Sequence, residues 1–351
     1  MREARSFGAD AWAGRYPAAW LATSATVAPR PLRARRRRVR MLLPAFVAWL
    51  AGALASAAPA YTLAAEDTVG FPCNSRIYAD EVKQGLVGLP RGDLFCLLVA
   101  DPKAIRTFVT YLAGRFPTNS GTISAASVGV GVGWPFFRLN GERVGDGLQL
   151  GIDAAVFSQF QIQTNTHDLL NADYLVGFPL TFRRDRFSAR LRVYHQSSHL
   201  GDKLLTRPEN AIRRQDVAFE AVEAIASYEI ALAIASHEIA FLRVYGGGEV
   251  LFDRAPRNLG QTLLHTGLEA RREVKPGARL VAALDLKVGE QDSWTPAWSV
   301  RAGVEFAFSR KPGDPLRVWS ILGEFYEGPS PYGQFFLQST RFGGFGFQLQ
   351  L

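Results

Sequence analysis

The sequence has little cysteine, no net charge beyond its first 60 residues, and no continuous apolar run after Ala60 that is long enough for a transmembrane helix. Two cysteines in 351 residues are too few for a disulfide scaffold or a cysteine-rich zinc module. The first 60 residues hold ten arginines and two acidic residues, which leaves 30 basic and 30 acidic residues in the other 291. This balance argues against a nucleic-acid-binding surface. Without an apolar helix, the chain is predicted to be either a soluble exported protein or a membrane β-barrel.

The first 60 residues have the pattern of a leader. A basic block over 33–40 runs directly into an apolar core over 41–57, and small residues follow at Ala57 and Ala60. A charged region, an apolar region and a small-residue cleavage site are typical of a secretory signal peptide. We therefore expect export and cleavage near Ala57 or Ala60, with an uncleaved membrane anchor as the alternative.

The two cysteines lie 23 residues apart, at Cys73 and Cys96. In an exported chain, a disulfide between them is favoured over two free thiols or a metal-binding pair. Residues 61–103 are rich in turn-forming residues and carry both cysteines. We expect this stretch to form a periplasmic N-terminal segment or a plug-like segment.

From about residue 104 onward, apolar residues alternate with polar or small ones. The alternation runs through 127–134, 148–156, 279–287 and 298–308, and charged residues occupy the second face. A period of two fits β-strands, and a polar interior with an apolar exterior is typical of transmembrane barrels. The prediction is an all-β fold, a transmembrane antiparallel β-barrel of about 12 strands over 104–351. A soluble sandwich would give similar alternation and remains the alternative.

Several features add detail to the barrel prediction. Aromatic residues such as Trp134, Trp294, Phe335 and Phe336 lie near predicted strand ends, where interfacial girdles are expected. The last strand, 345–351, resembles the C-terminal insertion signal of outer-membrane proteins, with Leu351 in place of the usual aromatic residue. This resemblance implies the barrel assembly machinery as a partner. Predicted strands start near residues 104, 122, 147, 173, 186, 215, 237, 261, 278, 294, 315 and 334.

Three segments carry a resemblance to a known family: 95–102, 168–180 and 194–202. They resemble exported bacterial proteins known only as domain-of-unknown-function family 1207, over about residue 75 to the C-terminus. The segment Tyr194-His-Gln-Ser-Ser-His-Leu-Gly-Asp202 is the most specific part, and its motif residues include Ser198, His199 and Gly201. The resemblance implies an outer-membrane barrel of unassigned activity in a Gram-negative bacterium.

One pair of residues in that segment has the spacing of a catalytic pair. The alternation over 187–197 places His195 and Ser197 on the apolar, lipid-facing side of one strand. There the imidazole could take the hydroxyl proton while Ser197 attacks an ester. Outer-membrane phospholipase A and the lipid A deacylase look similar here, because each carries a His-x-Ser pair on the outer barrel surface. By that resemblance His195 is the general base and Ser197 the nucleophile, although Ser198 stands where those enzymes usually have Asn.

A third group must accept the other imidazole N–H. Glu220, Glu223 and Asp202 are all candidates, since the strand register is unknown from the sequence. The alternative is that this segment only forms hydrogen bonds at the barrel mouth. A metal shared by His195 and His199 is a further reading. On a strand, however, that spacing leaves the two rings about 13 Å apart.

These observations leave three functional classes. The first is an outer-membrane protein with a structural or lipid-interacting role, for which membrane lipids are the expected partners. The second is a Ser/His lipid acyl hydrolase of the phospholipase or lipid A deacylase type. The third is a channel or transporter, which would need an open lumen. No cofactor, metal or nucleic acid is expected, and calcium enters only with the hydrolase.

Overall fold

The computed structural model describes residues 85–116, 121–143, 145–206, 215–234, 237–275, 277–308 and 317–350. The predicted leader over 1–60 and Cys73 lie outside these ranges. None of the helices in the described ranges is long and apolar enough to cross a membrane.

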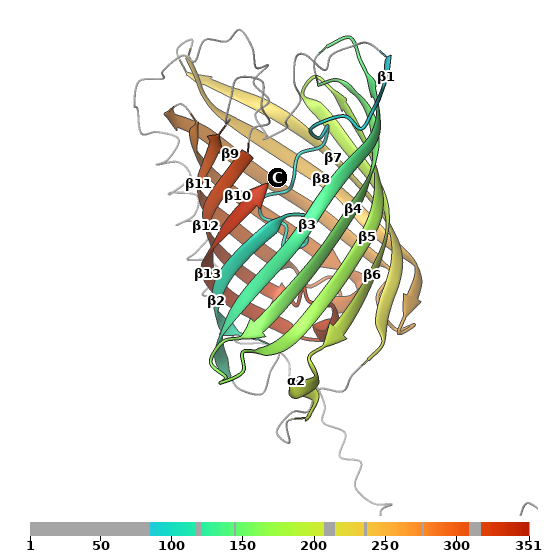
Figure 1. The fold of residues 1–351 in the computed structure, drawn as a ribbon, viewed down its shortest axis with the longest axis vertical. Helices are drawn as coiled ribbons and strands as arrows, with labels where there is room; N and C mark the ends of the chain where they lie inside the picture. The colour runs from blue at the N-terminus through green and yellow to red at the C-terminus, as the bar shows by residue number, and fades with distance from the viewer. Residues whose placement is uncertain are drawn as a thin grey trace, which may run out of the picture. The chain divides into compact units, whose positions relative to one another are not determined.

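Twelve antiparallel strands form one closed barrel (Figure 1). The barrel closes because β3 pairs with both β2 and β4, while β13 pairs with β2. The predicted fold class is therefore confirmed, and the sandwich alternative is wrong. The strands are β2 (Thr107–Arg115), β3 (Thr122–Asn140), β4 (Gly147–Gln161), β5 (Asp168–Arg184), β6 (Phe187–Leu200), β7 (Val217–Ile234), β8 (His237–Ala255), β9 (Thr262–Lys275), β10 (Ala278–Gly289), β11 (Ala297–Phe308), β12 (Arg317–Pro329) and β13 (Ser339–Gln350).

The two faces of the wall differ in the way that the alternation predicts. Large apolar side chains point outward, for example Trp134, which is 67% exposed, and Phe178, which is 54% exposed. Charged side chains point into the lumen and are buried there, as at Arg192, Glu269 and Arg301. An apolar exterior around a charged interior is the inverse of a soluble protein and suits a barrel surrounded by lipid.

A short strand extends the wall at its rim, and most of the segment after it lies inside the barrel. The strand β1 (Gly85–Gly88) pairs with residues 137–140 at the end of β3. Residues 89–106, here called the lumenal segment, then pass through the interior and join β2 (Figure 1). Leu94 and Ala100 of this segment are fully buried. The part of the predicted N-terminal segment that the structure describes therefore starts at the rim and continues into the barrel.

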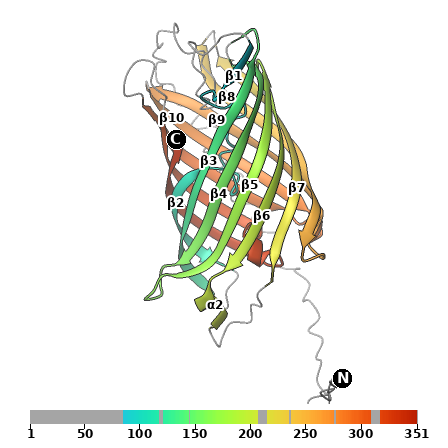
Figure 2. The ribbon, with the colours of Figure 1, turned by 45° about the vertical axis from the view of Figure 1, so that its right-hand side comes forward.

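The barrel has two different ends. Short connections join β5 to β6 and β9 to β10 at the end near β1, which we call the short-turn end. Longer connections lie at the other end, the long-loop end, where Figures 1 and 2 show α2 (Asp202–Thr206). The 3₁₀ turns η2 (Glu290–Asp292) and η3 (Gly333–Phe335) belong to two of these longer connections.

The observed strands start within five residues of their predicted positions, and the largest differences are at β5 and β13. The predicted start of the last strand near 334 falls on η3 instead. Phe335 and Phe336 read as strand and girdle residues in the sequence, but both are buried, at 2% and 8% exposure. The girdle assignment of these two residues is therefore wrong, because their loop folds back into the lumen, where their rings join the core.

Candidate functional site

The candidate site lies on β6, the fifth strand of the barrel wall. Its side chains alternate strictly: Val193 and His195 are exposed on the outer surface, whereas Tyr194 and Gln196 are buried. Because β6 runs from the short-turn end towards α2, His195 and Ser197 lie on the half of the outer wall nearer the long loops. The strand alternation thus places both residues on the outer face, as the sequence predicts.

A carboxylate on the neighbouring strand contacts His195. The register of β6 and β7 puts His195 directly opposite Glu220, and Nδ1 of His195 lies 2.8 Å from Oε1 of Glu220. The two side chains are 48% and 40% exposed on the outer face. With the proton on Nδ1, this N–H donates a hydrogen bond to the carboxylate, which fixes the ring and leaves Nε2 to act as a base.

Ser197 stands two residues further along the same face and is half-buried. Alternate residues of a strand are about 7 Å apart, so small side-chain rotations can bring hydroxyl and imidazole together. The hydrogen bonds of the described residues include none between Ser197 Oγ and the His195 ring. Such contacts are often long before substrate binds.

The other two predicted orienting groups lie elsewhere. Glu223 points into the lumen, where Arg190 and Arg192 contact it at 2.8 and 3.0 Å. Asp202 is the exposed first residue of α2. Glu220 and Glu223 are three positions apart on one strand, so their side chains face opposite sides of the wall. Of the three candidates, the structure brings only Glu220 to His195.

The remaining motif residues, Ser198, His199 and Gly201, have separate structural contacts. Ser198 is buried and its hydroxyl donates a hydrogen bond to Asp173. His199 is on the outer face, with its ring edge-on to Tyr174 at 5.6 Å between centroids. A Cβ on Gly201 would lie 1.9 Å from the carbonyl oxygen of Leu169, so only glycine fits where β6 ends.

A loop that sequence reasoning missed supports β6 from inside the barrel. Nε2 of Gln334, in η3, donates to the carbonyl oxygen of Ser198 at 2.6 Å, and its backbone N–H donates to Asn171 at 3.2 Å. Asp173 accepts hydrogen bonds from the Gly333 backbone N–H and from Lys103 of the lumenal segment. No local pattern signals such a fold-back, because its partners are far apart in the sequence.

Cys96 is buried in the lumenal segment and is disulfide-bonded. Arg183 Nη1 lies 3.8 Å from its sulfur. Cys73 lies outside the described residues, so the specific Cys73–Cys96 disulfide stays a prediction.

Charged side chains of the wall hold the lumenal segment in place. Arg243 and Arg301 each donate to a backbone carbonyl of the segment at 3.1 Å, and Glu269 accepts the Val99 N–H at 2.7 Å. Glu269 also pairs with Arg271 at 2.9 Å. Hydrogen bonds from buried charged side chains of the wall therefore hold the backbone of the lumenal segment in place.

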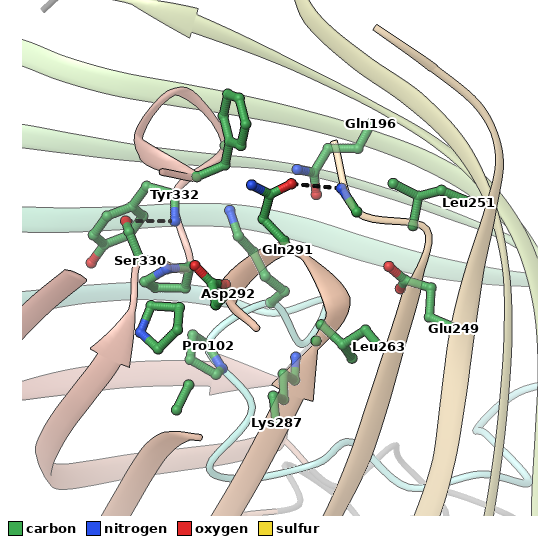
Figure 3. Close-up of a pocket in the computed structure, with 18 of the residues that line it drawn as sticks. Pro102, Gln196, Glu249, Leu251, Leu263, Lys287, Gln291, Asp292, Ser330 and Tyr332 are labelled. Atoms are coloured by element: carbon green, nitrogen blue, oxygen red, sulfur yellow. Dashed lines mark hydrogen bonds between the residues drawn. The ribbon is translucent and has the colours of Figure 1, made fainter. Parts of the chain in front are cut away.

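A cavity of about 210 Å³ lies in the lumen towards the long-loop end (Figure 3). Side chains of β6, β7, β8 and β10 line it together with residues of the loops that contain η2 and η3. Its walls include both apolar residues and carboxylates, for example Leu263, Glu249 and Asp292. The sequence does not predict this cavity, because the residues that line it come from strands spread around the barrel.

Metal coordination finds no support in the part of the chain that the structure describes. No group of three or more His, Cys, Asp or Glu side chains there could hold a metal ion. His195 and His199 point outward from an extended strand and contact different partners, Glu220 and Tyr174.

The closed wall, the apolar exterior and the charged interior define a β-barrel of the outer-membrane type. Residues 72–350 match the model of the family described as "Protein of unknown function (DUF1207)", and the chain belongs to this family.

Among solved structures, outer membrane phospholipase A from Escherichia coli is 11% identical with a TM-score of 0.44, covering 71% of this chain and 93% of that one. The transport unit of the autotransporter AIDA-I from Escherichia coli is 12% identical with a TM-score of 0.36, covering 74% and 94%. The NanC porin is 8% identical with a TM-score of 0.36, covering 69% and 100%. No curated protein matches the sequence. None of these similarities assigns an activity to the chain.

Proposed function

We propose that this protein is a serine hydrolase of the outer membrane that cleaves acyl esters of membrane lipids. Ser197 is the nucleophile, His195 the general base, and Glu220 the group that orients the imidazole. The observation that carries the proposal is the 2.8 Å contact between His195 and Glu220 on the outer surface of the barrel. A carboxylate, an imidazole and a hydroxyl on one accessible face are the parts that acyl transfer through serine requires.

The proposed reaction has two steps. Nε2 of His195 takes the proton from Ser197 Oγ, the oxygen attacks the ester carbonyl, and the protonated imidazole gives its proton to the departing alcohol. The acyl group is then bound to Ser197. His195 next removes a proton from water, which attacks the acyl carbonyl. The imidazolium gives this proton to Ser197 Oγ as the bond to the acyl group breaks, and the fatty acid is released. Glu220 stabilises the imidazolium that forms in each step.

The surroundings of the pair favour a lipid substrate. Val176 and Tyr174 stand opposite His195 and Ser197 on β5, and both are exposed on the outer face. Neighbouring Val193 and Leu191 continue the apolar surface along β6. An acyl chain could lie along this surface with its ester at Ser197, without leaving the membrane.

The location follows from the two ends of the barrel. Bacterial outer-membrane barrels place short turns in the periplasm and longer loops outside the cell. With the short-turn end in the periplasm, His195 and Ser197 lie in the outer leaflet. The proposal includes export by the predicted leader and insertion by the barrel assembly machinery. β13 supports insertion, since it is the last strand of the wall and Phe345 points outward from it.

Calcium is varied in the assay below but has no role in the proposed mechanism. The described residues around Ser197 offer no cluster of acidic or histidine side chains that fits a metal ion. No step of the mechanism therefore runs through calcium.

Fatty-acid release tests the proposal. The purified, folded barrel is incubated with phospholipid and with lipid A, with calcium and with chelator. Wild type should release fatty acid, whereas Ser197→Ala and His195→Ala should lose nearly all of it and Glu220→Ala should be slowed at least tenfold. Ser158→Ala is the matched control, because Ser158 also lies on the outward side of its strand, on β4.

Equal release by wild type and Ser197→Ala would contradict the assignment of the nucleophile. No release by a folded wild-type barrel under any of these conditions would overturn the hydrolase. A structural or lipid-interacting role in the envelope would then be the better account.

A further inference from the structure

The cavity in the lumen has walls of mixed character. Leu251 and Leu263 and the rings of Phe219, Tyr332 and Phe336 supply apolar and aromatic surface. Apolar walls with a few charged groups are characteristic of small-molecule sites. The cavity lies inside the barrel, whereas His195, Ser197 and Glu220 lie on its outer face, so it is separate from the proposed hydrolase site.

The cations that line the cavity already have carboxylate partners. Lys287 contacts Asp101 of the lumenal segment at 2.6 Å, and Arg192 contacts Glu223 at 3.0 Å. Lys103 pairs with Asp173. These pairs leave no excess positive charge for an anionic ligand.

Two carboxylates of the lining are in a different position. Glu249, from β8, accepts a hydrogen bond from the hydroxyl of Tyr194, and Asp292 comes from η2 (Figure 3). Among the described residues, neither forms a salt bridge with Lys, Arg or His. Burial raises the pKa of Asp292 to about 6, because its charged form loses water without gaining a cation. The cavity therefore contains two carboxyl groups that have no cationic partner among the described residues.

We propose that this cavity binds a small organic cation, an amine with a short apolar or aromatic body. The ammonium group would lie against one of these carboxylates, and the apolar body would lie against the aromatic and leucine side chains. Two carboxylates in partly apolar surroundings are stabilised by a cation that replaces lost water. Aromatic ring faces add a further attraction for an ammonium group. The adjoining loops give access from the long-loop end.

Calorimetric titration of the folded, full barrel in detergent tests the site, with phenethylammonium chloride as the probe. Uncharged 2-phenylethanol and anionic phenylacetate have similar apolar bodies and report partition into detergent. Phenethylammonium should bind saturably with one site per barrel, and the other two probes should show only partition. At least one of the variants Glu249→Gln and Asp292→Asn should weaken binding about tenfold, as expected for loss of one charged hydrogen bond.

Asp185→Asn is the matched control, because Asp185 is exposed at the opposite end of the barrel. It should bind phenethylammonium as wild type does. Equal uptake of all three probes, or unchanged binding in both cavity variants, would overturn the proposal. Ser197→Ala should bind the probe normally, so failure of the hydrolase and failure of the cation site give different results.

Discussion

The side-chain amide of Gln334 lies 2.6 Å from the backbone carbonyl oxygen of Ser198, directly behind Ser197 on the other side of the barrel wall. The loop between β12 and β13 thus holds the candidate catalytic strand from inside. The same amide nitrogen also donates to the carbonyl oxygen of Gln215 at 2.9 Å. One side chain therefore ties β6 to the start of β7, the strand that carries Glu220.

Replacing this amide should weaken the barrel. Gln334→Met keeps the size of the side chain but leaves the buried carbonyl oxygen of Ser198 and the part-buried one of Gln215 without this donor, at a cost of about 1–3 kcal/mol. We expect a lower midpoint in thermal or denaturant unfolding, followed by circular dichroism. Gln163→Met is the control, because Gln163 makes its hydrogen bond at an exposed position. Equal midpoints for the two variants would show that the tie contributes nothing to stability.

Glu269 is fully buried between arginines of β8 and β9 and the lumenal segment. Glu269→Ala would leave Arg243 and Arg271 short of a partner, and removing one side of a buried ion pair costs about 3–5 kcal/mol. We expect faster trypsin cleavage within residues 89–106, detected by mass spectrometry. Glu273→Ala, at an exposed position near the end of the same strand, should leave cleavage unchanged. If trypsin cleaved residues 89–106 no faster in Glu269→Ala than in Glu273→Ala, the position of the segment would not depend on Glu269.

The outward apolar face should be sensitive to charge. Phe178 points away from the lumen near the middle of β5, so Phe178→Arg would place a guanidinium in lipid. The expected loss of stability is about 2–4 kcal/mol, as for arginine at the bilayer midplane. Reversible unfolding from lipid vesicles measures it, with Phe178→Leu as the control. A loss below about 1 kcal/mol would place this surface outside the hydrocarbon region.

Asp292 should make stability depend on pH. Burial raises its pKa in the folded state to about 6, above the ordinary value of 3.8, so the neutral form is favoured by folding. The stabilising contribution of neutral Asp292 to folding is complete below about pH 4 and is lost as pH rises through about 6. Unfolding of wild type and Asp292→Asn between pH 4 and 8 measures this difference. Wild type should lose stability relative to the variant as pH rises, and parallel curves would rule out the shifted pKa.

Alternation in the sequence predicted the barrel because each strand has one face in lipid and one in the lumen. The same rule placed His195 and Ser197 on the outer face. It could not choose between Glu220 and Glu223, since that choice depends on how β6 and β7 are paired. In the structure this pairing is continuous and puts His195 opposite Glu220 and Arg192 opposite Glu223, but the register depends on contacts around the whole barrel.

Long-range burial also explains the error at the last strand. Gly328, Pro329, Pro331 and Gly333 mark a loop just before Phe335 and Phe336, but they do not show that the loop turns into the lumen, where both rings are buried. The lumenal contacts of Asp173 and Gln334 depend on groups up to 163 residues away. The cavity with Glu249 and Asp292 could not be predicted either, because the residues that line it are far apart in the sequence.

The lumenal segment lies beside the seam of the barrel. Residues 89–106 leave the rim after β1 and lead into β2, the strand whose pairing with β13 closes the cylinder. The segment is therefore joined to the wall at both ends, and its backbone contacts the arginines and carboxylates of the wall. We expect closure of the wall to be coupled to neutralisation of these charges, since an empty, charged cylinder would be costly in the membrane.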